Sequence, residues 1–306
     1  MEYKKPQATI IQGNVGIYPL TTADQVILAD GTRLEKDGKI NVDVANSADS
    51  AKLGGKAPEY YLQPRNLLDN SDFRNPVNQR GQTSYSVSEY TIDRWILYSS
   101  ASETITLTDE GITFTTGNNS FYQRVLKKSI KPGATYTLAY CTDGVVRITT
   151  LVFTDSSAGT TEAFDVAISV EAGKTLSWAA LYEGSYTADT LPPYVPKGYT
   201  AELLECLRYY VDMKKLNGAG MTGWNLYTPT YMFPIPMRAK PTITLSNPVT
   251  GTQNVIGKYN NQTGLYDDMS NVRISGASNQ SFSVVSDNGF IVNESYMFNA
   301  VASADM

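Results

Sequence analysis

The feature that most constrains the fold is a series of short segments in which apolar and polar residues alternate. Alternation with a period of two places successive side chains on opposite faces of a β-strand. Turn residues such as Asp143-Gly144 separate these segments, and no helical pattern lies between them. We therefore expect antiparallel strands packed as a β-sandwich or jelly roll. The expected strands are 104–108, 111–115, 136–140, 145–149, 164–170 and 176–182.

The 306 residues correspond to roughly two domains of ordinary size. Composition divides them further, into four parts of a mainly β protein. We expect an N-terminal attachment leader and linker over 1–65 and a β-sandwich over 66–198. A connecting helix over 199–216 and a smaller C-terminal β-sandwich over 217–306 complete the chain.

The leader contains short apolar runs that turn residues interrupt. Val26-Ile27-Leu28 stops at Asp30-Gly31, and a second run begins at Arg33, which predicts small hairpins. Other short runs lie within 10–18. Because such hairpins bury little surface, we expect the leader to pack against a partner. Small residues recur every three positions over 45–51. This spacing indicates either a surface helix or linker, or a narrow seam between identical chains.

One helix is expected over 199–216. Thr200 can cap its N-terminus, and acidic residues in the first turns favour the positive end of the helix dipole. Lys214 and Lys215 precede Asn217-Gly218, a typical helix end. The apolar residues at helical spacing are Leu203, Leu207, Tyr210 and Val211.

The last ninety residues resume the strand pattern, with Asn and Gly dense between the segments. Alternation predicts strands at 242–245 and 281–285. Three short apolar segments, 291–292, 296–298 and 300–302, are together expected to form two further strands.

The composition excludes several kinds of function. Lys and Arg total 25 against 30 Asp and Glu, a net charge of −5, whereas neutralising nucleic-acid phosphates requires a basic surface. The chain has no histidine, which removes histidine-based catalysis and histidine metal sites. No apolar run approaches the ~18 residues of a membrane span. We therefore expect no nucleic-acid partner, no membrane insertion, no enzyme activity and no cofactor.

The two cysteines, Cys141 and Cys206, form no CxxC pattern. A disulfide between them is one interpretation, and a pair of buried free thiols is the one we favour.

Two groups of carboxylates are candidates for metal binding or catalysis. Asp69 and Asp72 place oxygen ligands close together, which suits a calcium ion or an ordinary turn. Asp267, Asp268 and Glu294 could serve a glycan depolymerase, which needs paired carboxylates. Adjacent residues on a strand, however, face opposite sides.

Aromatic residues are abundant, with 21 tyrosines and three tryptophans. Trp95 and Trp178 lie among alternating apolar residues and are expected in the core. Trp224, Tyr227 and Tyr231 lie in a turn-rich stretch, where they could stack against sugar rings or form a subunit contact.

Two stretches carry a family resemblance. The first runs from Asn66-Leu67-Leu68-Asp69-Asn70 to Asp93-Arg94-Trp95, and the second from Pro192-Pro193-Tyr194 to Arg208-Tyr209-Tyr210. Together they resemble the start and end of a carbohydrate-binding-like jelly-roll module of bacteriophage and prophage fibre proteins, over about 66–215. The segment 48–56, with its Leu53-Gly54-Gly55-Lys56, is similar to a short element of phage tail-fibre chains.

The resemblance implies a non-enzymatic, usually trimeric virion appendage. Residues 1–65 would attach it to other virion proteins of the tail, baseplate or capsid, and the C-terminal part would face the host and bind cell-surface glycans during adsorption. Such a protein is assembled in the host cytoplasm, in agreement with unpaired cysteines. The alternatives are a structural head or neck fibre without receptor binding, and a depolymerase.

Overall fold

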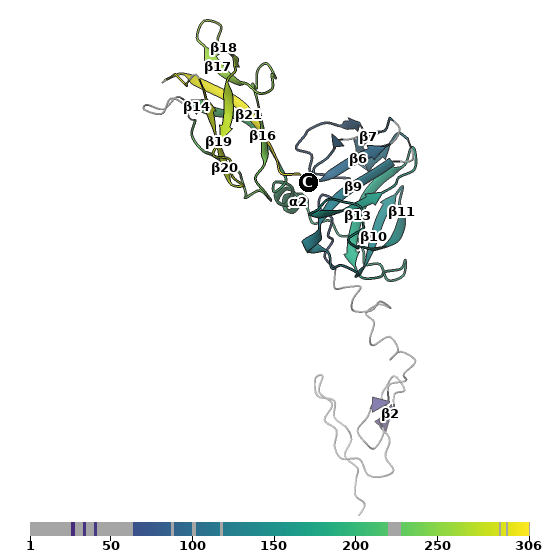
Figure 1. Cartoon of the computed structure of the whole chain (residues 1–306). Helices are drawn as coiled ribbons and strands as arrows, with labels where there is room; N and C mark the ends of the chain where they lie inside the picture. Colours follow the sequence, from purple (N-terminus) through teal and green to yellow (C-terminus); the bar gives the residue numbers. More distant parts are fainter. Residues whose placement is uncertain are drawn as a thin grey trace, which may run out of the picture. The chain divides into compact units, whose positions relative to one another are not determined.

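The computed structural model describes residues 64–86, 89–99, 102–116, 119–219, 228–287, 289–291 and 293–305, together with three short strands nearer the N-terminus (Figure 1). The chain divides into two compact units, Met1–Gln63 and Pro64–Met306. The fold is mainly β with antiparallel sheets, as the alternation predicts.

In the first unit, three strands form an antiparallel sheet in sequence order. They are β1 (Val26–Ile27), β2 (Arg33–Leu34) and β3 (Ile40–Asn41). Val26 pairs with Leu34, which confirms the hairpin expected around Asp30-Gly31. The apolar runs within 10–18, the small residues of 45–51 and the segment 48–56 lie outside the described residues.

The second unit begins with a sandwich of two antiparallel sheets, which confirms all six strands expected there. The larger sheet has the order β11 (Val145–Val152), β10 (Thr135–Thr142), β13 (Thr175–Glu183), β8 (Gly111–Phe114), β7 (Thr104–Thr108) and β4 (Ser84–Ser86). The smaller sheet has the order β12 (Ala163–Ile168), β9 (Asn119–Leu126), β6 (Trp95–Ser99) and β5 (Glu89–Tyr90).

Aromatic rings fill the centre of this sandwich. Trp95 is fully buried, as expected, and stacks on Phe121 with 4.8 Å between the ring centroids. Phe73 meets the Trp95 ring edge-on at 5.0 Å. The indole Nε1 donates to the carbonyl oxygens of Asp69 and Asn70, at 3.2 and 2.9 Å. The segment that enters the sandwich is therefore held by both packing and hydrogen bonds.

The expected helix over 199–216 is wrong in its second half. The helix α2 (Tyr199–Cys206) has eight residues and follows Gly198, so that Thr200 lies inside it rather than capping it. Residues Tyr210–Ala219 form strand β14, which pairs with β21 (Ser295–Ser303). Tyr210 and Val211 are buried in that pairing. Aromatic and β-branched residues suit a half-buried sheet, and this tertiary pairing outweighs a weak local helix preference.

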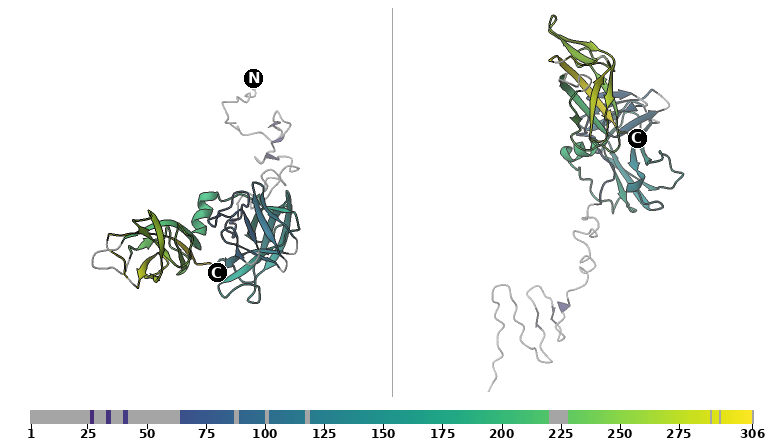
Figure 2. Two further views of the ribbon diagram at one scale, coloured as in Figure 1. Left: turned by 90° about the horizontal axis from the view of Figure 1, so that it is seen from above. Right: turned by 60° about the vertical axis from the view of Figure 1, so that its left-hand side comes forward.

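The C-terminal domain contains two sheets around a second core, which confirms the β structure expected for this part of the chain. Strand β21 lies between β14 and β17 (Ile256–Asn260), and β17 pairs on its other side with β18 (Leu265–Met269). Strand β16 (Thr242–Ser246) also pairs with β21. The second sheet has the order β15 (Tyr231–Met232), β20 (Ser281–Ser286) and β19 (Val272–Ser275). In Figure 2 these strands, green to yellow, form a group separate from those of the sandwich. The expected pair of strands near the C-terminus is instead one long strand, β21, and Ile291 lies outside any strand.

A buried charge cluster joins the sandwich to the C-terminal domain. Arg80 contacts Asp93 at 3.0 Å and Asp305 at 3.1 Å, and its guanidinium lies 3.9 Å from the centre of the Tyr210 ring. Gln79 Nε2 donates to the Tyr210 carbonyl at 2.8 Å. Burial raises the pKa of Asp93 to about 6, although Arg80 opposes this shift.

This cluster predicts a pH dependence of stability. The folded chain holds the Asp93 proton more tightly than the unfolded chain, whose pKa is near 3.8. The contribution of Asp93 to the free energy of unfolding should therefore be largest below about pH 4 and fall by up to about 3 kcal/mol as the pH rises through 6. In Asp93→Asn that contribution is absent. Urea unfolding of both proteins from about pH 4 to about pH 7 measures it.

The difference between the two proteins is the quantity to follow, because Asp305, Glu202 and Glu205, whose pKa values burial also raises, are present in both. A wild-type minus Asp93→Asn difference that stays constant across this range would contradict the prediction.

Candidate functional site

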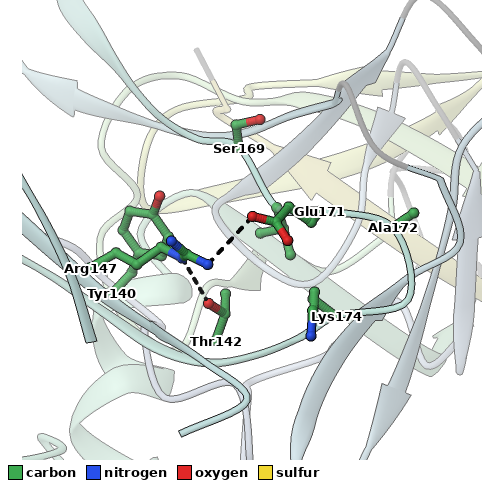
Figure 3. Close-up of a pocket in the computed structure, with 8 residues that line it drawn as sticks. Tyr140, Thr142, Arg147, Ser169, Glu171, Ala172 and Lys174 are labelled. Carbon is green, nitrogen blue, oxygen red and sulfur yellow. Dashed lines mark hydrogen bonds and ion pairs between the residues drawn. The ribbon is translucent and has the colours of Figure 1, made fainter. Parts of the chain in front are cut away.

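An open pocket of about 360 Å³ lies at one end of the sandwich, where β10, β11 and the segment after β12 meet (Figure 3). Its lining is largely polar and includes both charges. The lining residues are Tyr140, Thr142, Arg147, Ser169, Val170, Glu171, Ala172 and Lys174.

A tight hairpin forms one wall of the pocket. Asp143 and Gly144 join β10 to β11 with φ of 48° and 79°, the positive values that a two-residue hairpin turn requires. In the resulting register Tyr140 lies directly opposite Arg147, so their side chains are neighbours on one face. The half-buried Tyr140 ring packs against the sandwich core, which gives this wall a fixed aromatic surface.

The turn between β12 and β13 forms the opposite wall. Lys174 N donates to the Glu171 carbonyl at 3.2 Å, and Gly173, with φ 71°, allows the chain to reverse there. This turn brings the Glu171 carboxylate to the Arg147 guanidinium, with 3.4 Å between Oε1 and Nη2. Ser169 lies on the same wall (Figure 3).

The charged groups of the pocket are accessible to solvent. The side chains of Arg147 and Glu171 are 47% and 69% exposed. Arg147 Nε also donates to Thr142 Oγ1 at 3.3 Å, which orients the guanidinium. Lys174 contacts Asp143 at 3.0 Å, and a hydrogen bond from the Thr175 backbone, with the Lys174 contact, lowers the pKa of Asp143.

This arrangement suits the binding of a polyhydroxylated ligand. The volume lies within the range of small-molecule sites, at roughly 300–1,000 Å³. The Tyr140 ring offers an apolar surface for the C–H face of a sugar, while Arg147 donates and Glu171 accepts hydrogen bonds from hydroxyl groups. The lining holds one carboxylate, Glu171, whereas the usual glycosidase mechanism uses two on either side of the scissile bond.

Of the three residues expected to form an aromatic sugar platform, the structure describes Tyr231 alone. The half-buried Tyr231 donates its hydroxyl to the Asn217 carbonyl at 2.8 Å, and its ring packs against Phe282 and Phe298. Tyr231 thus contributes to the C-terminal core. Trp224 and Tyr227 lie outside the described residues.

The expected pairing of Asp69 with Asp72 at a calcium ion is also not formed. Asp69 contacts Arg94 at 3.3 Å and Lys197 at 3.4 Å, while Asp72 pairs with Arg74 at 2.7 Å. Burial raises the pKa of Asp69, but Arg94, Glu205 and Lys197 outweigh it and leave that pKa below its usual value. Among the residues that the structure describes, no cluster of three or more acidic or cysteine side chains suits a metal.

The carboxylates considered for depolymerase chemistry each have a hydrogen-bonding or ionic partner. Asp267 accepts from Asn260 at 2.6 Å, Asp268 from Asn247 at 2.7 Å, and Glu294 contacts Lys258 at 2.7 Å. Hydrogen bonds from Thr250 and Thr252 lower the pKa of Asp268. A general acid needs the opposite shift, so this carboxylate is poorly suited to that role.

Trp178 is half-buried rather than part of the core. Its ring stacks on Tyr194 with 4.7 Å between centroids and 6° between planes, and both line a second cavity of about 280 Å³. Burial raises the pKa of the Tyr194 hydroxyl. Val146 and Ile148 of β11 form the apolar side of this cavity. Sequence patterning could not show this stack because it depends on where the segment after β13 crosses the sheet.

Both cysteines are buried and free, which confirms the favoured interpretation. None of the helices within the described residues has the length and apolar character that crossing a membrane would require. Comparisons of the chain with protein-family models, with curated proteins and with solved structures found no match.

The exposed pair in the pocket should contribute little to folding. Replacing Glu171 by Gln is expected to change the free energy of unfolding by less than about 1 kcal/mol, because solvent screens the charges. Arg94→Gln, which removes a buried charge and leaves the half-buried Asp69 without this partner, should cost about 3–5 kcal/mol. Urea unfolding of both variants tests the contrast. A loss of several kcal/mol in Glu171→Gln would mean that the pair serves the fold rather than a ligand.

Proposed function

We propose that this chain is a virion fibre protein that binds host cell-surface glycans during phage adsorption, without cleaving them. The observation that carries the proposal is the pocket of Figure 3, where the Tyr140 ring and Arg147 lie on one wall and Glu171, which pairs with Arg147, lies on the other. An aromatic surface beside a donor and an acceptor is the combination that a pyranose ring requires.

The remaining parts of the proposal follow from the sequence resemblance. Residues 1–65 attach the chain to tail, baseplate or capsid proteins, and three copies assemble in the host cytoplasm into a homotrimer. A shallow, solvent-exposed pocket binds weakly by itself. Three linked copies compensate, because multivalency raises avidity by ~10²–10⁴ over a single site.

Array binding and titration test the pocket directly. Wild-type protein is applied to an array of bacterial surface polysaccharides, and the strongest ligand is then titrated into wild type, Arg147→Gln and Tyr140→Ala. Each variant should bind about tenfold more weakly, because it loses a charge-assisted hydrogen bond or the aromatic wall.

Matched controls sit elsewhere on the chain. Arg273→Gln removes another exposed guanidinium, paired with Asp287 at 3.0 Å, and Tyr98→Ala removes an exposed tyrosine. Both should bind as wild type does. Failure of the intact protein to bind any glycan or whole host cells would favour the structural head or neck fibre. Release of reducing sugar, abolished by Asp267→Asn or Asp268→Asn, would favour the depolymerase.

The assembly state is a separate prediction. Full-length protein at micromolar concentration should have the mass of a trimer in light scattering, since closed cyclic assemblies are the usual outcome for homomers. A monomeric mass would remove the avidity argument, while leaving the single-site titration to decide on binding.

A further inference from the structure

A third pocket, distinct from the Trp178–Tyr194 cavity, differs in chemical character from the pocket in Figure 3. Its volume is about 250 Å³, and it lies where the segment after Pro64, the start of β6, the turn after β9 and the end of α2 come together. Four cationic side chains line it, against two carboxylates. They are Arg65, Arg94, Lys128 and Arg208, with Asp69 and Glu205.

The lining of this pocket includes a buried guanidinium, that of Arg94, with one nitrogen that makes no hydrogen bond to the described residues. Arg94 is 2% exposed, donates from Nη2 to the Arg124 carbonyl at 2.7 Å and from Nε to Asp69 at 3.3 Å. Its Cζ lies 3.5 Å from the centre of the Tyr209 ring. Nη1, in contrast, has no hydrogen-bond partner among the described residues. A buried donor without an acceptor costs free energy, which a bound acceptor would recover.

The two carboxylates are already engaged with another cation. Lys197, which is outside the lining, lies 3.4 Å from Asp69 and 2.7 Å from Glu205. Burial, together with the neighbouring Asp69, raises the pKa of Glu205. The lining cations are therefore not balanced within the pocket.

The rim carries the unbalanced charge. Arg65, Lys128 and Arg208 are all exposed. None of the three forms an ion pair with another residue in the described part of the chain. Cations gathered around a concave site attract anions and strengthen their binding.

We propose that this pocket binds an oxyanion, a carboxylate or phosphate group. Arg94 Nη1 donates to one oxygen, and Lys128 and Arg208 contact the others at the rim. Because Nη1 is itself buried, the atoms that cover it have to shift when the anion enters. The inference is independent of the proposed function, since it uses another pocket and other residues.

Calorimetric titration of the full chain tests it with three probes at constant ionic strength: sodium phosphate, sodium glucuronate and neutral glucose. At least one anion should bind, and glucose should not. Lys128→Gln and Arg208→Gln should each weaken anion binding about tenfold, through loss of a charge-assisted contact. Arg273→Gln, which removes one positive charge in the C-terminal domain, should bind as wild type does.

Tighter binding of phosphate or of glucuronate identifies the group that the pocket selects, and either result supports the proposal. It is overturned if neither anion binds, if glucose binds as well as glucuronate does, or if both rim variants retain wild-type affinity. The rim variants should fold, because their side chains are exposed and unpaired, so Arg94 need not be replaced. A null result here leaves the test of Arg147 and Tyr140 unaffected.

Discussion

The indole ring of Trp95 stacks on Phe121 and donates its Nε1 hydrogen to the carbonyls of Asp69 and Asn70. That contact fixes the segment from Asn66 to Phe73 against the sandwich. Asn70 then donates from Nδ2 to the carbonyls of Val77 and Asp93, both at 2.8 Å. Because Asn70 has φ 51°, it reverses the chain there and leaves its backbone N–H to be bound by Glu202 of α2, at 2.6 Å. One short segment thus connects the core to the helix that leads to the C-terminal domain.

The same segment explains how a buried cation is tolerated. Arg94 follows directly on Asp93 with φ 74° and is held by Asp69, the Arg124 carbonyl and the Tyr209 ring. A buried guanidinium is costly unless its charge and donors are matched. Asp69 supplies the charge, and Lys197 compensates for the second carboxylate, Glu205. The ionic groups of this region therefore stabilise the junction first, and the rim cations are additional to that requirement.

Much of the sandwich could be predicted because its strands have one buried face. The strand at 104–108 alternates cleanly, and Ile105 is fully buried. Strand β9 was missed because Gln123 occupies a core position between Phe121 and Val125. This glutamine is fully buried and exchanges hydrogen bonds with both backbone groups of Asp69, at 2.8 and 2.7 Å. A polar side chain satisfied by a distant partner breaks the pattern without breaking the strand.

The site was less predictable than the fold for a related reason. The turn at Asp143-Gly144 predicts a hairpin, and with it the pairing of Tyr140 with Arg147. Glu171 reaches Arg147 only because β12 belongs to the opposite sheet and its turn returns to β13 beside β10. Local patterning contains no information on that return. Residues chosen for their type alone, such as Tyr231 and Asp72, serve packing and a local ion pair instead, because an aromatic or an acid is as useful to a β-sheet core or a turn as to a ligand.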